Sequence, residues 1–428
     1  MRAQTLPEVI RFFDPMHPLE KQELKDWYID RPGNPLERIK IHLQGLGLAN
    51  PPQPVKILFT GHVGSGKSTT LNKLAEELEN QFFIVPFDVR RSASIADLTY
   101  IDLILGIATS LFRRATEPGV LGKAPAQIAG DVWDDISRFI KDVIFGPADF
   151  RPPPADAEMA TKVNLMALEF QTKFAREAST RDETRKRIEP RLAELHDKIN
   201  LVADLVSVKY KRPVLFFVEG TDKPDLERAR DIFRGHTYAL TAFRASVIYT
   251  FPIGLRYSAA DFGLIKDHFT HAFVLPNLKV ANRDGSDNPV GLECLKEILM
   301  RRMAQELVDP KARDQLVRAS GGLLRTLIQL VRQSAVNSIV AGDEMISTAS
   351  AQEAIIEERT NFVAGLSRDD YPVLYERHLD KQLSGDDSVL SLLQTRALLE
   401  YANGDSWCAV HPIALPLILE RAPQAKEE

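Results

Sequence analysis

Short apolar runs alternate with segments of helical periodicity over the first two thirds of the chain. The runs have the length and composition of strands that are buried on both faces of a sheet. These expected strands are residues 55–60 (VKILFT), 82–89 (FFIVPFDV), 214–218 (VLFFV) and 245–251 (ASVIYTF). The expected helices are residues 35–46, 67–80, 97–113 and 225–243. Such alternation predicts an α/β domain with a parallel sheet.

From about residue 289 onward the periodicity is helical, as in the segments GLECLKEILMRRMAQEL and LLRTLIQLVRQSAVNSIVA. Ser350, with Glu353 three residues later, has the spacing of a capping box at the start of a further helix. In the tail, LLEYA and SWCAV flank Asn403-Gly404-Asp405, which predicts a sharp turn between two strands. Helices followed by such a ribbon resemble a winged helix.

The region from about residue 115 to 212 differs in composition from the rest of the chain. A segment rich in proline and glycine precedes a highly charged stretch over residues 159–198, which is broken at Pro190. Such charge usually marks solvated helix faces, and the alternative is an inserted hairpin that contacts a partner or a neighbouring subunit. The sequence leaves this choice open.

These patterns predict a P-loop NTPase fold with a parallel sheet, a C-terminal helical lid and a winged-helix-like tail. A chain of 428 residues is long enough for about two to three domains. The expected divisions are 1–50, an N-terminal helical segment; 51–288, the ATPase core with its insertion; 289–366, the lid; and 367–428, the tail.

Composition is that of an ordinary soluble chain, with 44% hydrophobic and 26% charged residues and a formal net charge of −5. The slight acidity argues against wholesale coating of nucleic acid. Two cysteines are too few for a disulfide framework or a Cys-rich zinc site, which favours a reducing compartment. No apolar run is long enough for a membrane span and no signal peptide is expected, so the expected location is the cytoplasm, away from membranes.

A complete P-loop motif joins the first expected strand to the helix that follows it. The motif consists of Gly61, His62, Val63, Gly64, Ser65, Gly66, Lys67 and Ser68, followed by Thr69. Glycines let successive backbone N–H groups turn toward a phosphate, and the start of the helix adds a favourable dipole. Lys67 is expected to reach the β- and γ-phosphates and the Ser68 hydroxyl to bind Mg²⁺. The sequence therefore predicts an ATP and Mg²⁺ site.

The strand over residues 214–218 ends in Glu219-Gly220-Thr221-Asp222, which delivers carboxylates to the carboxyl edge of the sheet. Mg²⁺ and the attacking water are expected there. Glu219 is expected to bind Mg²⁺ through water and Asp222 to orient the water, or the two exchange roles. The alternative for Asp222 is a structural role at the start of the turn before Pro224.

Two later features complete the candidate site. Thr250 lies near the end of the strand over residues 245–251, where it is either a polar side chain that senses the γ-phosphate or an ordinary β-branched strand residue. Ser320-Gly321-Gly322-Leu323-Leu324-Arg325 opens a helix, and Arg325 on its first turn is placed to project back toward the phosphates. A surface salt bridge is the alternative role for Arg325.

The order of these motifs resembles that of AAA+ and STAND-type ATPases, in particular the origin-recognition and STAND branch, which includes ATPases of bacterial defence systems. The resemblance extends over about residues 25 to 428. It implies that Lys67 is the phosphate lysine, that Glu219 and Asp222 are the acidic pair, and that Thr250 and Arg325 are the first and second sensors. Glu219 stands where Asp is usual, which places the rate of turnover in question.

The same resemblance assigns Tyr28, Asp30 and Arg31 to a short motif that holds adenine, although Asp30 stands where Gly is usual. It also implies a homo-oligomer in which a neighbouring subunit supplies an arginine to the transferring phosphoryl group. The candidate arginines are Arg228, Arg230, Arg234, Arg244 and Arg256, and each is also explained as ordinary helix-surface charge.

The function favoured by these features is an ATP-driven switch that hydrolyses ATP and assembles with, or signals to, a separately encoded protein effector, as in a bacterial antiviral defence system. The alternative is a DNA-binding initiator, loader or transposition-type ATPase that uses the winged-helix-like tail. Charge does not favour DNA, because the tail segment LSRDDYPVLYERHLDKQLSGDDSV carries more acids than bases. A small-molecule P-loop kinase is disfavoured by the long helical lid and tail.

Overall fold

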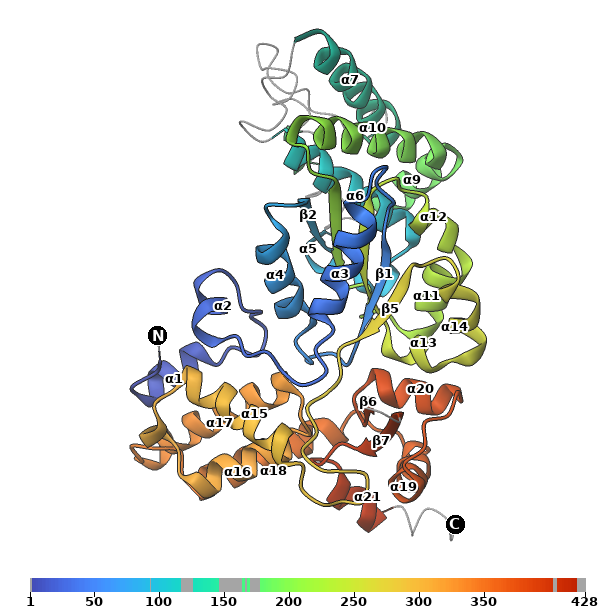
Figure 1. Cartoon of the computed structure of the whole chain (residues 1–428). Coiled ribbons are helices and arrows are strands. Elements are labelled where there is room, and N and C mark those ends of the chain that lie inside the picture. Colours follow the sequence, from blue (N-terminus) through green and yellow to red (C-terminus); the bar gives the residue numbers. More distant parts are fainter. Residues whose placement is uncertain are drawn as a thin grey trace.

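The structure is a computed structural model that describes residues 2–92, 94–116, 126–145, 164–165, 168–169, 178–402 and 406–421. A sheet with helices on both faces forms the middle of the molecule, and the C-terminal helices and ribbon lie together at one end of it (Figure 1). Much of the charged stretch predicted over residues 159–198 falls outside the described residues, as does the turn predicted at Asn403-Gly404-Asp405.

Within the described residues, five parallel strands form one sheet in the order β2-β3-β4-β1-β5. The strands are β1 (Lys56–Thr60), β2 (Phe83–Asp88), β3 (Val214–Glu219), β4 (Ser246–Phe251) and β5 (His271–Val274). β4 pairs with β1 on one side and with β3 on the other. The carboxyl ends of β1, β4 and β3, which lead to the P-loop, Thr250 and the carboxylates, therefore meet at one edge of the sheet. This is the predicted α/β fold of a P-loop ATPase.

β5 was not predicted from the sequence. It is a short edge strand that pairs with β1 alone, and its first residue, His271, is exposed. An edge strand that begins with an exposed histidine carries too few consecutive apolar residues to stand out as a buried run.

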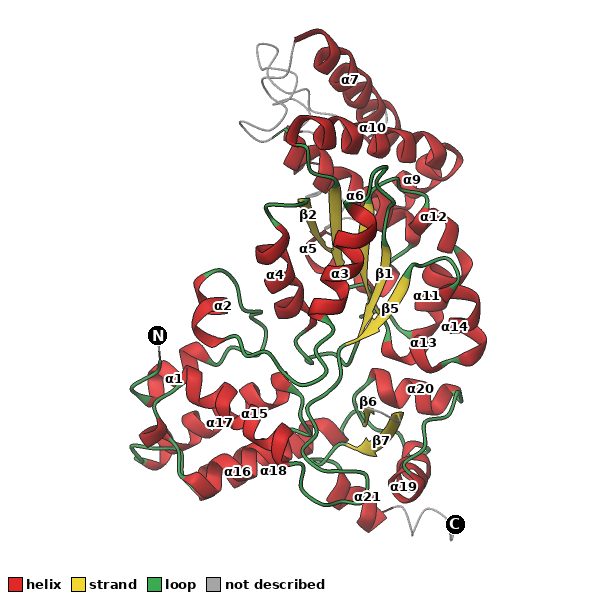
Figure 2. Ribbon diagram, viewed as in Figure 1, coloured by secondary structure: helices red, strands yellow, loops and turns green. Residues whose placement is uncertain are grey.

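Alternate residues of the strands face two separate hydrophobic clusters. Ile57 and Phe217 pack with α3 (Leu36–Gly47) and α4 (Lys67–Leu78) on one face. Leu58 and Phe216 pack with α6 (Tyr100–Ala115) and α10 (Leu192–Tyr210) on the other. Figure 2 shows the strands between these helical layers. The two-faced burial explains why the strands are continuous apolar runs rather than alternating ones.

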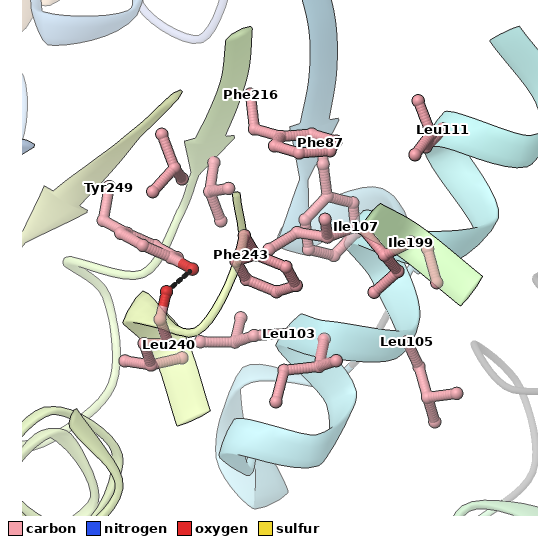
Figure 3. Packing of buried hydrophobic residues seen from close by; sticks show 14 of the residues in the cluster. Phe87, Leu103, Leu105, Ile107, Leu111, Ile199, Phe216, Leu240, Phe243 and Tyr249 are labelled. Atoms are coloured by element: carbon pink, nitrogen blue, oxygen red, sulfur yellow. Dashed lines mark hydrogen bonds between the residues drawn. The ribbon is translucent and has the colours of Figure 1, made fainter. Parts of the chain in front are cut away.

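The larger cluster contains aromatic residues contributed by three strands. Phe87, Phe216 and Tyr249 extend from β2, β3 and β4 toward Leu103 and other side chains of α6 (Figure 3). The Tyr249 hydroxyl donates a hydrogen bond of 2.9 Å to the Leu240 carbonyl, which satisfies the polar atom inside the cluster. This packing holds the face of the sheet that α6 covers, away from the edge that carries the motifs.

The single helix predicted over residues 225–243 is interrupted in the structure. α11 (Leu226–Arg230) passes into a π-helical turn over Asp231–Gly235, and α12 (Thr237–Thr241) follows. The Thr237 hydroxyl donates to the Phe233 carbonyl, so a side chain bonds the backbone where the regular helix stops. Helical periodicity in the sequence does not distinguish a π turn from an α turn.

The C-terminal helices are confirmed, with one correction to a boundary. They are α15 (Pro289–Arg302), α16 (Pro310–Ala319), α17 (Leu324–Ala341) and α18 (Thr348–Val363). Ser347, and not Ser350, caps α18, because its hydroxyl accepts a hydrogen bond of 3.3 Å from the Ser350 N–H. Ser350 lies inside the first turn and is buried, so the predicted capping box with Glu353 is wrong.

The tail contains helices followed by an antiparallel ribbon, as the sequence predicts. Its elements are α19 (Asp370–Asp380), α20 (Asp387–Gln394), β6 (Leu398–Ala402), β7 (Ser406–Val410) and α21 (Leu415–Arg421). Ile253, on the short helix after β4, belongs to the same hydrophobic cluster as residues of α19, α20 and both strands of the ribbon. The tail is therefore packed against the α/β domain.

The remaining elements lie before the sheet, between β2 and β3, and after β4. They are α1 (Leu6–Phe12), α2 (Gln22–Trp27), α5 (Val89–Ser92), α7 (Ala126–Phe139), α9 (Ala178–Ile188), α13 (Ile253–Tyr257) and α14 (Ala259–Lys266). Short 3₁₀ or π turns lie over Ile95–Asp97, Ile140–Phe145, Glu189–Arg191 and Gln305–Leu307. In the described part of the chain, no helix combines the length and the apolar character that crossing a membrane requires.

Candidate functional site

The loop between β1 and α4 places its backbone and one lysine at the edge of the sheet. Gly64 and Gly66 have φ values of 90° and 97°, and α4 begins at Lys67 directly after Gly66. Lys67 Nζ donates to the carbonyl oxygens of Gly61 at 2.7 Å and His62 at 3.0 Å. It also forms an ion pair of 2.8 Å with Asp222 Oδ2. The sequence-predicted phosphate lysine and one predicted carboxylate are therefore in direct contact.

The carboxylates after β3 occupy different electrostatic surroundings. Burial raises the pKa of the Asp222 carboxyl, but the cations of Lys67 and Lys223 outweigh it and hold that pKa well below its usual range. Burial raises the pKa of the Glu219 carboxyl, and a hydrogen bond from Ser68 only partly opposes the rise. Among the described residues, Glu219 Oε2 is buried without a hydrogen-bond partner. Asp222 is thus a neutralised anion, and Glu219 is a carboxyl with one oxygen free.

Thr250 lies near the end of β4, between the P-loop strand and the carboxylate strand. Its hydroxyl accepts a hydrogen bond of 3.1 Å from the Thr221 N–H, next to Asp222 in the chain. The Thr221 hydroxyl in turn donates to the Thr250 carbonyl. These bonds tie the position of the acidic loop to the end of β4.

Arg325 lies on the first turn of α17, directly over the P-loop. Its N–H donates to the Gly64 carbonyl at 3.0 Å, and its Nε donates to the Pro15 carbonyl at 3.1 Å. A β-carbon at position 64 would come within 2.6 Å of Arg325 Cβ, so only glycine permits this approach. The structure thus brings the first turn of α17 into contact with the P-loop.

A single pocket collects most of the predicted residues and opens between the P-loop, α17 and the N-terminal segment. Tyr28 and Arg31 line it together with Asp222, Thr250 and Arg325. From the P-loop region the lining residues are Gly64, Gly66, Lys67, Ser68 and Thr69. Apolar side chains that line it include Leu19, Trp27, Ile29, Ile298, Leu324 and Ile328.

Some predicted residues do not line this pocket. Glu219 lines an adjoining hollow that shares Arg90 with the pocket. Asp30 lies at a separate hollow with Cys294, and its carboxylate accepts a hydrogen bond of 3.0 Å from Asn34. The other P-loop residues outside the lining are Gly61, His62, Val63 and Ser65.

The tail contacts the loops that carry the motifs. His62 Nε2 accepts a hydrogen bond of 2.8 Å from the Glu400 N–H on β6, and both residues are buried. Gln394, at the end of α20, donates to the Asp222 carbonyl at 2.7 Å. The Tyr401 hydroxyl donates to the Gly321 carbonyl at 2.8 Å, in the turn before α17. Sequence motifs gave no signal for these contacts, because they join segments that are far apart in the chain.

Each candidate finger arginine has a neighbour within its own chain. Arg230 and Arg234 pair with Asp261, at 2.8 Å and 2.9 Å. Arg244 pairs with an acid on α10, Arg228 with the residue that caps α11, and Arg256 stacks on a phenylalanine ring. None of these five lines the pocket that is formed by the described residues.

Other cations of the pocket were not singled out from the sequence. Lys223 lines it and lies 3.4 Å from Asp222 Oδ2. Its position beside Asp222 in the chain was the available signal. Arg302, on α15, lines it from the far side and stacks over Trp27. Only the folding of α15 against the N-terminal segment brings Arg302 there, so no local motif could indicate it.

The donor set fits the cofactors that the motifs imply. Carboxylate and hydroxyl oxygens, such as those of Glu219 and Ser68, are the ligands Mg²⁺ prefers. The cations that line the pocket are Arg31, Lys67, Arg90, Lys223, Arg302 and Arg325, and Asp222 is the acid among the lining residues. A pocket with this excess of cations at a helix N-terminus is suited to a polyanion such as a nucleoside triphosphate.

No protein-family model matches the chain, and no curated protein matches its sequence. Solved structures resemble it over nearly its whole length, at low identity. Cdc6p from Pyrobaculum aerophilum is 13% identical, with 97% of this chain and 98% of that chain covered and a TM-score of 0.41. The ORC2 protein of Aeropyrum pernix is 12% identical, with 97% and 98% covered and a TM-score of 0.44.

A third similar structure is the RuvB Holliday junction branch migration motor of Thermotoga maritima. It is 12% identical, with 95% of this chain and 99% of that chain covered and a TM-score of 0.38. Because identities and TM-scores are this low, the function of the present chain is inferred from the residues of its own pocket.

Proposed function

We propose that this chain is an ATP-binding and ATP-hydrolysing molecular switch of the AAA+ and STAND type. The observation that carries the proposal is the convergence of Lys67, Asp222, Thr250 and Arg325 on one cationic pocket at the start of α4. Residues from four separate segments meet there. A packing role alone would not need so many cations around a glycine-rich loop.

Bound ATP with Mg²⁺ would supply a γ-phosphoryl group for transfer to water. Lys67 exchanges its bonds to the P-loop carbonyls for bonds to phosphate oxygens, and Asp222 keeps the ammonium in position through their ion pair. Ser68 and Glu219 would hold Mg²⁺. Because Lys67 already neutralises the charge of Asp222, the proposal assigns to Glu219 the role of accepting a hydrogen bond from the attacking water. Glu219 would accept this bond either as a direct contact or while it also holds Mg²⁺.

The switch is proposed to act through the lid and the tail. Arg325 bonds the P-loop, and the tail bonds the P-loop at His62 and the acidic loop at Asp222. If either loop moves when it binds a phosphate, these contacts must therefore break, or the lid and the tail must move together with the loop. Nucleotide-dependent movement of lid and tail is a means of exposing a surface to a partner.

The proposed partners are further copies of this chain and a separately encoded protein effector. The resemblance of the sequence motifs to those of ATPases of bacterial defence systems is the reason for proposing that this effector acts in antiviral defence. An arginine supplied in trans would raise the rate of phosphate release as protein concentration rises. The hollow beside Glu219 supports this arrangement, because it is open to an incoming side chain.

Phosphate release from ATP and Mg²⁺ tests this function. We expect Glu219→Gln to reduce release by about 10²-fold or more while ATP still binds, because a neutral amide lacks the charge and basicity with which a carboxylate draws a proton from the water. Asp222→Asn should weaken ATP binding as well, because Lys67 loses its ion pair. Asp197→Asn, an exposed acid of α10, is the matched control. Release that is unchanged in both site variants would show that the acidic pair is wrongly assigned.

A DNA-binding initiator or loader is the second candidate, supported by the helices and ribbon of the tail. The helix before the ribbon, α20, has the sequence DSVLSLLQ and carries no Lys or Arg. It buries Leu390 and Leu393 against neighbouring elements, and its last residue bonds the Asp222 carbonyl. A filter-binding titration with duplex DNA at low and moderate salt decides between the candidates, and salt-dependent binding would favour the loader.

A further inference from the structure

Arg31 is a buried cation that contacts no counter-ion among the residues that the structure describes. Its side chain is only 7% exposed, and within the described chain neither Nη1 nor Nη2 has a hydrogen-bond partner. The charged or ionisable groups that act on it are Asp30, Tyr28 and Cys294, and none of them forms an ion pair with it among the described residues. Burial lowers the pKa of the guanidinium to about 10, so it remains charged at neutral pH.

The position of Arg31 indicates the kind of group that would pair with its guanidinium. Its Nη2 lies 3.9 Å from the point that a β-carbon on Gly66 would occupy, and Gly66 caps the N-terminus of α4. In a P-loop, the backbone N–H groups here cradle the α- and β-phosphates. A buried, unpaired guanidinium beside an anion-binding helix terminus is completed by an anion.

We infer that Arg31 binds the α- or β-phosphate of the nucleotide, rather than the adenine that the sequence motif implies. The inference rests on the proposed nucleotide site. In this arrangement Arg31 stabilises the negative charge of the α- or β-phosphate, and Lys67 and Arg325 stabilise the charge of the terminal phosphate. Because ADP and ATP share these phosphates, Arg31 strengthens the binding of both nucleotides and does not distinguish between them.

The energetics of the nucleotide-free protein follow from the same geometry. A guanidinium that is buried without a partner destabilises the fold, whereas a paired one does not carry this penalty. Removing the charge of Arg31 should therefore leave the nucleotide-free protein as stable as before or more stable. A residue with a purely structural role would give the opposite result.

The test compares Arg31→Met with the wild type, with ADP, ATP and inorganic tripolyphosphate as ligands. We expect the dissociation constants of ADP and ATP to rise by the same factor, about 10-fold or more. Binding of tripolyphosphate should weaken by a similar factor. The melting temperature without ligand should be unchanged or higher. If the Arg31→Met protein is too unstable for binding to be measured, Arg31→Lys is used in its place. This variant keeps the positive charge but loses the paired N–H donors of the guanidinium, so it should show a smaller loss of affinity for all three ligands.

Arg377→Met is the matched control, because Arg377 is a buried arginine of α19 that is paired with Asp380 and Glu376. It should lower the melting temperature and leave the affinities unchanged. Unaltered ADP and ATP binding by Arg31→Met would overturn the inference. So would a loss of ATP binding with tripolyphosphate binding intact, because that result places Arg31 at the base. A wild type that binds tripolyphosphate but no nucleotide would instead refute the proposed function.

Discussion

The charged residues of this site differ in whether their charges are paired with an opposite charge. Lys67 and Asp222 neutralise each other at 2.8 Å, whereas in the described part of the chain Arg31 has no such partner and one oxygen of Glu219 has no hydrogen bond. The sequence predicted all four as site residues, but it could not show this pairing. Pairing depends on distances between segments that are more than a hundred residues apart.

Glu400 is a further residue with an unusual charge state. Burial raises the pKa of its carboxyl to about 7, although the Tyr257 hydroxyl donates to it at 2.6 Å and the cations Arg256 and Lys279 lie nearby. Its other oxygen has no partner among the described residues. The acid is therefore mainly protonated below neutral pH, next to its backbone bond with His62.

Stability should depend on pH through Glu400. Between its ordinary pKa of 4.5 and about 7 the unfolded chain releases the proton while the folded protein retains it, so stability falls as pH rises. Glu400→Gln should remove on the order of 2–3 kcal/mol of that fall. Urea unfolding of both proteins at pH 5 and pH 8 measures it. An identical fall in both proteins would show that another group is responsible.

At the scale of elements, the site depends on the docking of the lid helix on the P-loop. The sequence predicted α17 and its start correctly, because Gly321-Gly322 and the periodicity that follows are local signals. From the sequence we expected only that the first turn of α17 faces the phosphates, without a specific contact to Gly64. The structure makes this contact close enough to exclude a side chain at position 64.

Gly64→Ala should disturb both folding and nucleotide binding. The β-carbon would meet Arg325 at 2.6 Å, and the φ of 90° is unfavourable for alanine. We expect a loss of about 1–3 kcal/mol in unfolding free energy and weaker ATP binding. Gly263→Ala is the control, because it lies inside α14 with open space around it and should stabilise by about 0.5–1 kcal/mol. Equal effects of the two changes would contradict the docking.

The elements that the sequence missed share a physical cause. β5 is short and lies at the sheet edge, the helix over residues 225–243 contains a π turn, and the cap of α18 is set by Ser347. In each case tertiary contacts or side-chain bonding to the backbone decide the local structure. Periodicity does not record such bonds, whereas it does record the buried strands β1 to β4.

For the whole molecule, the tail is the part whose role the structure sharpens most. The net charge of −5 already argued against broad contact with nucleic acid. In the folded chain the tail bonds the P-loop, the acidic loop and the turn before α17 through Glu400, Gln394 and Tyr401. Long-range contacts of this kind have no sequence signature, and they make the tail a sensor of the pocket in the proposed switch.

A calorimetric titration of ATP with Mg²⁺ tests the central claim most directly. The wild type should bind ATP at one saturable site per chain, and Lys67→Met should bind it about 10–100-fold more weakly or not at all. Lys73→Met, on the same helix and outside the pocket, should bind like the wild type. No ATP binding by the wild type, or equal binding by Lys67→Met, would contradict the assignment of this pocket as an ATP site.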